Sequence, residues 1–505
     1  MPVIKVSVKW SGKKFDDIEI DTDDAATVFK ATLFSLTGVP PDRQKIMVKG
    51  GMLKEETDLN SLGIKAGHQF MMMGTAGELP KEPPKKTVFL EDMSGSELAQ
   101  AMEIPNGLVN LGNTCYMNAT LQTLRAIPEL QDAMKQLSVP LSSNPRQNIA
   151  VSLRDLYRLL DTTPEAVPPL VFLQVLRSAF PQYAEQSARG GYAQQDAEEC
   201  WTSLVSSLKD TVPGKDNEGK WVKPSEGRGW VEEYMTGEME HTLTCDEDPN
   251  EPKKISTDTF SKIQINISQG VVTYMASELE QSLTSSLEKR SESLDRNAKY
   301  TQKSAFSRLP AYLAVQFVRF QWKPQEGVKA KILKRVKFPF ELDMNPYTTK
   351  ELAEKLKPGR DYVRKRADEK EAEKKKSKAE KRDASGEVKK SEPQTSGGDP
   401  MDVVQTSKTV EQVYGEIGLA TELRTDIGAS VTGIYDLIGV VTHIGRTAEG
   451  GHYIGWVRKG LTDDWFKFDD DKVSPVRTED ITKLEGGGEY HAAYICLYKT
   501  RSLLD

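Results

Sequence analysis

One cysteine of the chain lies in a sequence context that favours nucleophilic chemistry. Cys115 follows the turn-forming residues Gly112, Asn113 and Thr114 and precedes a helix-like stretch, "YMNATLQTL". Asn113 or Thr114 can cap a helix that begins near Cys115, and the positive end of the helix dipole favours a thiolate there. The alternative is packing, because cysteine is among the most buried residue types. This stretch alone leaves both interpretations open.

A thiolate nucleophile needs a base, and the base needs a group that orients it. The chain has five histidines, and His452 is the candidate we favour, because glycines precede it and an amphipathic strand follows in "RTAEGGHYIGWV". Antiparallel pairing of this strand with "WFKFDD" would bring Asp469 or Asp470 towards the imidazole. The alternative for "DDD" is a turn that carries solvated charge.

The elements that must position these residues begin after a separate N-terminal module. Residues 1–75 read as two strands, a helix and two further strands, which is the order of a β-grasp domain. Phe29, Leu33 and Leu36 fall on one face of the helix, and Gly38 ends it. The stretch "PPDRQKIMVKGGMLKEETDLNSLGI" resembles the second half of ubiquitin. Because no diglycine ends the module, we expect a fixed ubiquitin-like domain rather than a conjugation tag.

A proline-rich linker is expected at 76–103, and one large catalytic domain at 104–500. The predicted fold class is α+β for the whole chain. A lysine- and glutamate-rich segment at about 355–400 holds almost no apolar residues, so we predict a disordered, solvated insertion there. A role in nuclear import or in binding an acidic partner is the alternative.

Composition excludes several classes of function. The 505 residues carry a net charge of −7, which argues against a nucleic-acid binder. No apolar run approaches the roughly 20 residues of a membrane helix, and no secretory signal is visible. The four cysteines include no CxxC pair, so we expect neither a disulfide framework nor a metal site, and no cofactor. The chain is predicted to be cytoplasmic and nuclear.

Five sequence stretches identify a family resemblance. They are "GLVNLGNTCYMNATLQTL", "GYAQQDAEECW", "RLPAYLAVQFVRF", "YDLIGVVTHIG" and "GGHYIGWV…WFKFDDDKVSPV…AAYICLY", which span Asn106 to Tyr498. Their order resembles that of the ubiquitin-specific proteases. With the ubiquitin-like module, the chain looks most similar to the proteasome-associated deubiquitinases of that family. The resemblance implies a papain-like fold with thumb, palm and finger regions, and cleavage of the isopeptide bond after ubiquitin's C-terminal glycine.

The resemblance also implies roles for single residues. Cys115 matches the nucleophile, His452 the general base and Asp469 the third member of the triad. Asp470 matches a neighbour that can substitute for Asp469. Asn110 matches the residue that stabilises the oxyanion, and an amide five residues before the thiol is chemically able to do so.

Substrate and partner contacts follow from the same resemblance. Asp196 and Glu199 match acidic residues that hold the arginine-bearing tail of ubiquitin, although Asp196 can equally cap a helix. The expected partners are ubiquitin conjugates and the regulatory particle of the proteasome, which the ubiquitin-like domain would bind near Met47. No nucleic acid and no membrane is expected. Cys245 stands alone, so the zinc-bound finger of many relatives is excluded and packing must hold these strands.

The glycine-rich stretch before His452 suggests a movable loop over the groove for ubiquitin's tail. We therefore expect a slow free enzyme and a groove that opens on docking. The competing hypothesis is a ubiquitin-binding adaptor at the proteasome in which chemistry is secondary.

Overall fold

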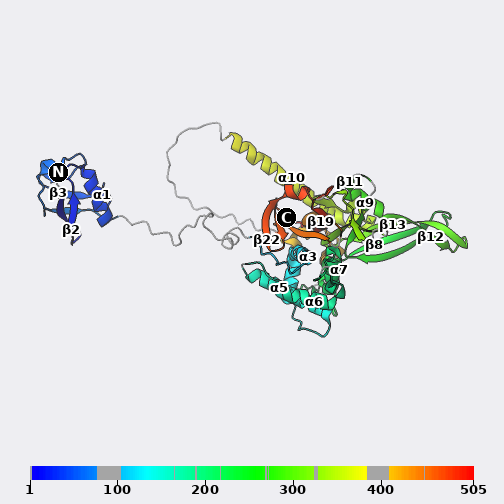
Figure 1. Cartoon of the computed structure of the whole chain (residues 1–505). Coiled ribbons are helices and arrows are strands. Elements are labelled where there is room, and N and C mark those ends of the chain that lie inside the picture. Colours follow the sequence, from blue (N-terminus) through cyan, green and yellow to red (C-terminus); the bar gives the residue numbers. More distant parts are fainter. Residues whose placement is uncertain are drawn as a thin grey trace. The chain divides into compact units, whose positions relative to one another are not determined.

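The computed structural model describes residues 3–76, 104–383 and 409–504, apart from short gaps at 164, 188–189, 217, 268–269, 271, 324–327, 448–449 and 489. The chain divides into two compact units, Met1–Met93 and Ser94–Asp505, and Figure 1 colours both along the sequence. The predicted linker lies, beyond Ala76, outside the described residues.

The first unit has the predicted β-grasp fold. Its sheet has the order β2-β1-β5-β3-β4, in which β1 and β5 are parallel. The helix buries Phe29 and Leu33 and ends at Gly38, whose φ of 69° suits glycine. Leu36, which we placed on the buried face, is exposed, because the buried stripe runs through Leu33 and Thr37 instead. The elements are β1 (Ile4–Trp10), β2 (Lys13–Ile20), α1 (Ala26–Thr37), β3 (Lys45–Val48), β4 (Gly51–Met52), η1 (Leu59–Leu62) and β5 (Gln69–Met73).

Helices form one side of the second unit. The central helix α3 (Cys115–Arg125) is buried along almost its whole length, from Cys115 to Leu124. It packs against α7 and α4, and α5 packs on α7 and α6, which with α5 lies at the lower edge of this unit in Figure 1. The surrounding elements are α4 (Pro128–Gln136), α5 (Pro145–Thr162), α6 (Leu170–Ala179), η3 (Pro181–Ala184), α7 (Ala197–Lys209), β6 (Gly214–Lys215), β7 (Trp221–Val222) and α8 (Trp230–Tyr234).

A mixed sheet with the order β10-β14-β23-β19-β20-β21-β22 packs against these helices. Helix α3 lies directly on β20. Gly455 permits this approach, because a Cβ there would lie 3.1 Å from the carbonyl oxygen of Ala119. The strands are β10 (Ile263–Asn266), β14 (Tyr312–Val318), β19 (Ile434–Thr447), β20 (Gly450–Arg458), β21 (Asp464–Asp469), β22 (Lys472–Arg477) and β23 (Ala492–Thr500). Helix and sheet together confirm the α+β class.

Short elements border this sheet. The hairpin of β15 and β16 joins the end of β19 through a single pair, Ala330 with Thr447. The short elements are β11 (Val272–Tyr274), α9 (Met275–Ser282), β15 (Phe320–Lys323), β16 (Val328–Lys331), β17 (Arg335–Lys337), β18 (Glu341–Asp343), η4 (Asn345–Tyr347), α11 (Val410–Ile417), α12 (Thr421–Thr425) and α13 (Thr478–Thr482).

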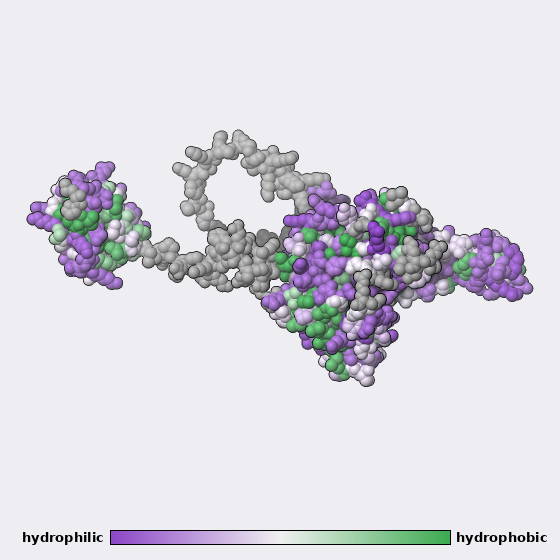
Figure 2. All heavy atoms as spheres, viewed as in Figure 1, coloured by the Kyte–Doolittle hydropathy of each residue, from purple (hydrophilic) through white to green (hydrophobic). Residues whose placement is uncertain are grey.

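A four-stranded antiparallel sheet, β12-β13-β8-β9, extends away from the helices as the finger region (Figure 1). Its far end is largely hydrophilic in Figure 2. Cys245 is buried here and packs with Ala298 and Tyr300 in a small apolar cluster. The strands are β8 (Gly237–Cys245), β9 (Lys254–Phe260), β12 (Thr284–Ser291) and β13 (Arg296–Arg308).

Helix α10 (Lys350–Asp383) differs from the prediction, because it occupies much of the segment expected to be disordered from about residue 355. Leu352, Leu356 and Val363 are buried in the core, and Arg360 binds both carboxylate oxygens of Asp343 at 2.7 and 2.8 Å. These few anchors at helical spacing hold the first turns, which the charged composition concealed. The rest of the predicted insertion lies outside the described residues.

Among the described residues, none of the helices combines the length and the apolar character needed to cross a bilayer.

Candidate active site

The thiol of Cys115 stands at the first residue of α3. Asn110 folds the preceding turn, because its Oδ1 accepts hydrogen bonds from the backbone N–H groups of Gly112 (2.9 Å) and Thr114 (3.2 Å). Thr114 is the N-cap residue, but its side chain accepts from the N–H of Leu111 (2.9 Å) rather than capping the helix. The sulfur therefore lies at the positive end of the α3 dipole, where negative charge is stabilised.

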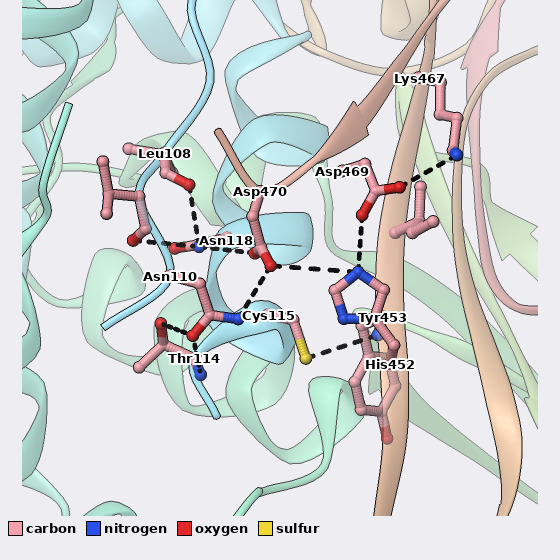
Figure 3. Close-up of polar contacts among 12 residues, drawn as sticks. Leu108, Asn110, Thr114, Cys115, Asn118, His452, Tyr453, Lys467, Asp469 and Asp470 are labelled. Atoms are coloured by element: carbon pink, nitrogen blue, oxygen red, sulfur yellow. Dashed lines mark hydrogen bonds and ion pairs between the residues drawn. The ribbon is translucent and has the colours of Figure 1, made fainter. Parts of the chain in front are cut away.

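The predicted hairpin places the base beside its carboxylate. Strands β20 and β21 pair antiparallel, with Gly455 opposite Phe468. This register brings His452 Nε2 to 2.7 Å from Asp469 Oδ1, and Figure 3 shows the imidazole between Asp469 and the thiol of Cys115. Lys467 Nζ contacts the second carboxylate oxygen at 3.0 Å. The three side chains thus come together as the sequence predicted.

Electrostatics favour a charged imidazole. The hydrogen bond with Cys115 raises the pKa of His452 to about 9, against the effect of burial, and the hydrogen bond with Asp469 adds to the rise. Burial would raise the pKa of Asp469, but the hydrogen bonds from His452 and Lys467 outweigh it and hold that pKa below its ordinary value. His452 is therefore charged near neutral pH, and this charge lies beside the sulfur of Cys115.

Asp470 is linked to the oxyanion candidate rather than directly to the base. Its Oδ2 accepts from Asn110 Nδ2 at 2.8 Å, and its Oδ1 accepts from Asn118 Nδ2 at 2.8 Å. The same Oδ2 lies 4.0 Å from His452 Nε2, which is beyond hydrogen-bonding distance. Asp470 thereby connects the loop before the thiol, helix α3 and the turn after β21 (Figure 3).

Asp196 and Glu199 border a groove of about 900 Å³ that Asn113, Gly450 and Gly451 also line. Asp196 is the N-cap of α7, which is the capping role predicted for it, since its Oδ1 accepts a hydrogen bond from the N–H of Glu198 at 2.8 Å. Its Oδ2 accepts from the hydroxyl of Tyr494, and burial raises its pKa to about 6. Glu199 is half-exposed and pairs with Lys329 at 3.1 Å.

The other histidines near the site are poor bases. Burial lowers the pKa of His443 to about 3 and that of His491 to about 4, so both rings are neutral near pH 7. Within the described residues, His452, Asp469 and Asp470 are the group whose possible ligand atoms lie within 4.8 Å of one another. Two of these atoms already share a hydrogen bond, as expected of a base and its orienting acid.

Sequence reasoning missed three residues that support this geometry. Asn118 lies one turn after the thiol, is 2% exposed and binds Asp470; a polar residue on a buried helix face was the available signal. Lys467 lies two residues before Asp469 on β21, so the two side chains share a face, but only the folded strand shows their contact. Gly451 allows the chain just before His452 to lie close to β19, because a Cβ at this position would lie 2.0 Å from the carbonyl oxygen of Ile444.

Comparison with known proteins supports one family along almost the whole chain. The sequence profile described as "Ubiquitin carboxyl-terminal hydrolase" matches residues 106–498, and that of the "Ubiquitin family" matches residues 4–77. The chain is 42% identical to Ubiquitin carboxyl-terminal hydrolase 6 of Schizosaccharomyces pombe, over 99% of this chain and 100% of the relative. It is 40% identical to Ubiquitin carboxyl-terminal hydrolase 6 of Arabidopsis thaliana, over 98% of each chain. Ubiquitin carboxyl-terminal hydrolase 14 of Caenorhabditis elegans is 34% identical, over 99% of this chain and 94% of the relative.

Proposed function

The chain belongs to the ubiquitin carboxyl-terminal hydrolase family and is a thiol-dependent deubiquitinase with an N-terminal ubiquitin-like domain, and on this premise we propose how its residues divide the reaction. The observation that carries the proposal is the position of the His452 imidazole between the thiol of Cys115 and Asp469, whose Oδ1 lies 2.7 Å from Nε2 (Figure 3). A thiolate, an imidazolium and an orienting carboxylate suffice for acyl transfer to sulfur.

In the first half-reaction, the Cys115 thiolate attacks the carbonyl carbon of ubiquitin's last glycine. The C–N bond to the substrate lysine breaks, and the His452 imidazolium gives its proton to the departing amine. In the second half-reaction, neutral His452 takes a proton from water, which attacks the thioester carbon. Ubiquitin leaves with a free carboxylate, and the thiolate–imidazolium pair is restored. Asp469 keeps the imidazole in one orientation throughout.

Asn110 and the backbone N–H of Cys115 are proposed to bind the oxyanion. An amide nitrogen carries two hydrogens, so the donation from Asn110 Nδ2 to Asp470 (2.8 Å) leaves a second hydrogen for the substrate oxygen. In this arrangement Asp470 orients the oxyanion donor, and it substitutes for Asp469 only at longer range. Loss of one such donor typically lowers kcat by about 10²- to 10³-fold.

The groove beside Asp196 and Glu199 is proposed to hold the arginine-bearing tail of ubiquitin. The Glu199 carboxylate already binds one cation, Lys329, through a pair that is 42–47% exposed. Such exposed pairs contribute at most about 1 kcal/mol, so an arginine of the tail can replace the lysine. Asp196 contributes from the first turn of the same helix, where it also serves as the cap.

The ubiquitin-like domain is proposed to dock on the regulatory particle of the proteasome through the surface around Met47, and the chain to work in the cytoplasm and the nucleus. We further propose that the free chain is slow and that docking opens the groove. The composition of the groove's border supports this proposal, because the β19–β20 hairpin contributes two glycines, Gly450 and Gly451, and β16 contributes the half-exposed Lys329. Faster hydrolysis of a ubiquitin–fluorophore conjugate by the docked chain is expected; equal rates for the free chain would contradict it.

The deciding experiment uses ubiquitin with an electrophilic C-terminus, with and without proteasome. A covalent adduct should form on the full chain and disappear in Cys115→Ala, while ubiquitin binding by the variant remains measurable. If no adduct forms even with proteasome present, the proposed nucleophile is wrong and the adaptor hypothesis is favoured.

A further inference from the structure

Four methionines lie together on the outer face of the β-grasp sheet. Met47 of β3 is opposite Met52 of β4 and also opposite Met71 of β5. Met73 follows Met71 by two residues on the same strand, so its side chain emerges on the same face. The exposed fractions of the four side chains are 45%, 54%, 54% and 53%, in chain order. We call these four residues the methionine patch.

The neighbouring residues on the same strands point into the core. Ile46 is 0% exposed, and Phe70 and Met72 are each 2% exposed. Elsewhere in the described part of the chain, the largely exposed apolar side chains include no further methionine. The exposed thioethers are therefore concentrated on one sheet face, and Figure 2 shows hydrophobic residues at the surface of this unit among hydrophilic ones.

Thioether chemistry gives such a face two properties. Methionine is flexible and polarisable, so a patch of four makes an adaptable apolar docking surface. An exposed thioether is also readily oxidised to the sulfoxide, which is polar and chiral and disrupts methionine-rich interfaces. A sulfoxide at the centre of a docking surface must be desolvated on binding, which costs free energy unless the partner supplies a hydrogen bond.

We propose that the methionine patch is an oxidative modification site whose conversion to sulfoxide weakens docking. A hydroperoxide transfers one oxygen atom to each thioether sulfur: the O–O bond breaks, an S–O bond forms, and water or an alcohol leaves. The sulfur is oxidised and the peroxide is reduced. The consequence for docking rests on the proposed role of the Met47 face, whereas the modification itself depends only on exposure.

The experiment treats the full chain with hydrogen peroxide and follows each methionine by peptide mass spectrometry. Met72 is the matched internal control, because it lies between Met71 and Met73 on β5 but is buried. We expect the four patch residues to gain one oxygen atom at least about tenfold faster than Met72. Equal rates would overturn the proposal.

The second arm measures binding to purified proteasome after the oxidised chain has been treated with a thiol reductant, which reduces a sulfenic acid at Cys115 back to the thiol but leaves methionine sulfoxide unchanged. We expect at least about tenfold weaker binding, recovered with methionine sulfoxide reductase. The variant with leucine at all four positions is compared with itself before and after peroxide, and its binding should not change. An equal loss in that variant would overturn the switch.

The two proposals fail in different ways. If the untreated chain does not bind the proteasome, the docking role and the switch that depends on it are both wrong. The mass readout still decides whether the patch is a modification site. Adduct formation at Cys115, measured in parallel, should be the same before oxidation and after thiol reduction; a lasting loss there would assign the effect to the catalytic domain.

Discussion

The hydrogen bond between His452 and Asp469 offers the most direct test of the proposed triad. Its length is 2.7 Å, whereas Asp470 lies 4.0 Å from the same nitrogen and already accepts from two amides. Asp469→Asn keeps the shape of the side chain and removes its charge. A hydrogen bond to a charged group contributes about 1.5–3 kcal/mol, so kcat/KM should fall about 10- to 150-fold.

The pH profile gives an independent signature of the same contact. Hydrolysis should decline as pH rises through the His452 pKa of about 9, because the imidazolium is the proton donor. Asp469→Asn removes one cause of that raised pKa, so its alkaline limb should move to lower pH. The folded pKa of His452 lies above its ordinary value of 6.5, so the charged imidazole stabilises the fold. This contribution to the free energy of unfolding is complete below about pH 6.5 and is lost as pH rises towards 9. The variant should therefore lose less stability over this window.

The assay is hydrolysis of a ubiquitin–fluorophore conjugate by the proteasome-bound chain, on both sides of the alkaline limb. Asp471→Asn is the matched control, because it changes an exposed carboxylate in the same turn. Asp470→Asn distinguishes the two carboxylates, since it should impair the oxyanion donor and move the limb less than Asp469→Asn does, because the charge of Asp470 is a smaller cause of the raised His452 pKa than the hydrogen bond with Asp469. If Asp469→Asn stays within about threefold of the parent and the limb does not move, Asp469 is not the orienting acid.

Two further predictions concern the groove. Asp196→Asn should preserve the helix cap, since asparagine caps as well as aspartate. It should not lower the free energy of unfolding at pH 7 in urea. Because the folded pKa of Asp196 is raised to about 6, charging this buried carboxyl costs stability as pH rises from about 4 to 6. A KM for the ubiquitin conjugate that does not rise would leave Asp196 as a cap alone. Gly451→Ala should lower the free energy of unfolding by about 1–3 kcal/mol through overpacking, since its Cβ would meet Ile444 O at 2.0 Å. Gly460→Ala shares the positive φ but has open space, so a loss of equal size there would assign the effect to backbone strain.

Local patterns were reliable where one element determined the outcome. The β-grasp order followed from alternating and helical periodicities within about 75 residues, and the helix after Cys115 followed from its turn residues and apolar spacing. The hairpin that carries His452 and Asp469 was also predictable, because antiparallel pairing over a short connection fixes which residues face each other. The charged composition of 355–383 misled us, because two buried apolar residues, Leu356 and Val363, and one buried arginine in this range are enough to anchor a helix that begins before it.

The sequence by itself determined the kinds of residue and their local placement. It indicated a thiol at the start of a helix, an imidazole on one strand of a hairpin, and carboxylates at the end of the other strand. Only the tertiary structure decided how α3 meets β20, because that packing depends on contacts more than 300 positions apart, such as the backbone N–H of Tyr453 with the sulfur of Cys115. The family resemblance had already given the two aspartates different roles, and the structure gives them different distances from His452 Nε2, 2.7 Å for Asp469 and 4.0 Å for Asp470. The physical reason is that a one-residue step along the turn after β21 redirects the side chain, and the positive φ of Asp470 (55°) turns its carboxylate towards the amides instead of the imidazole.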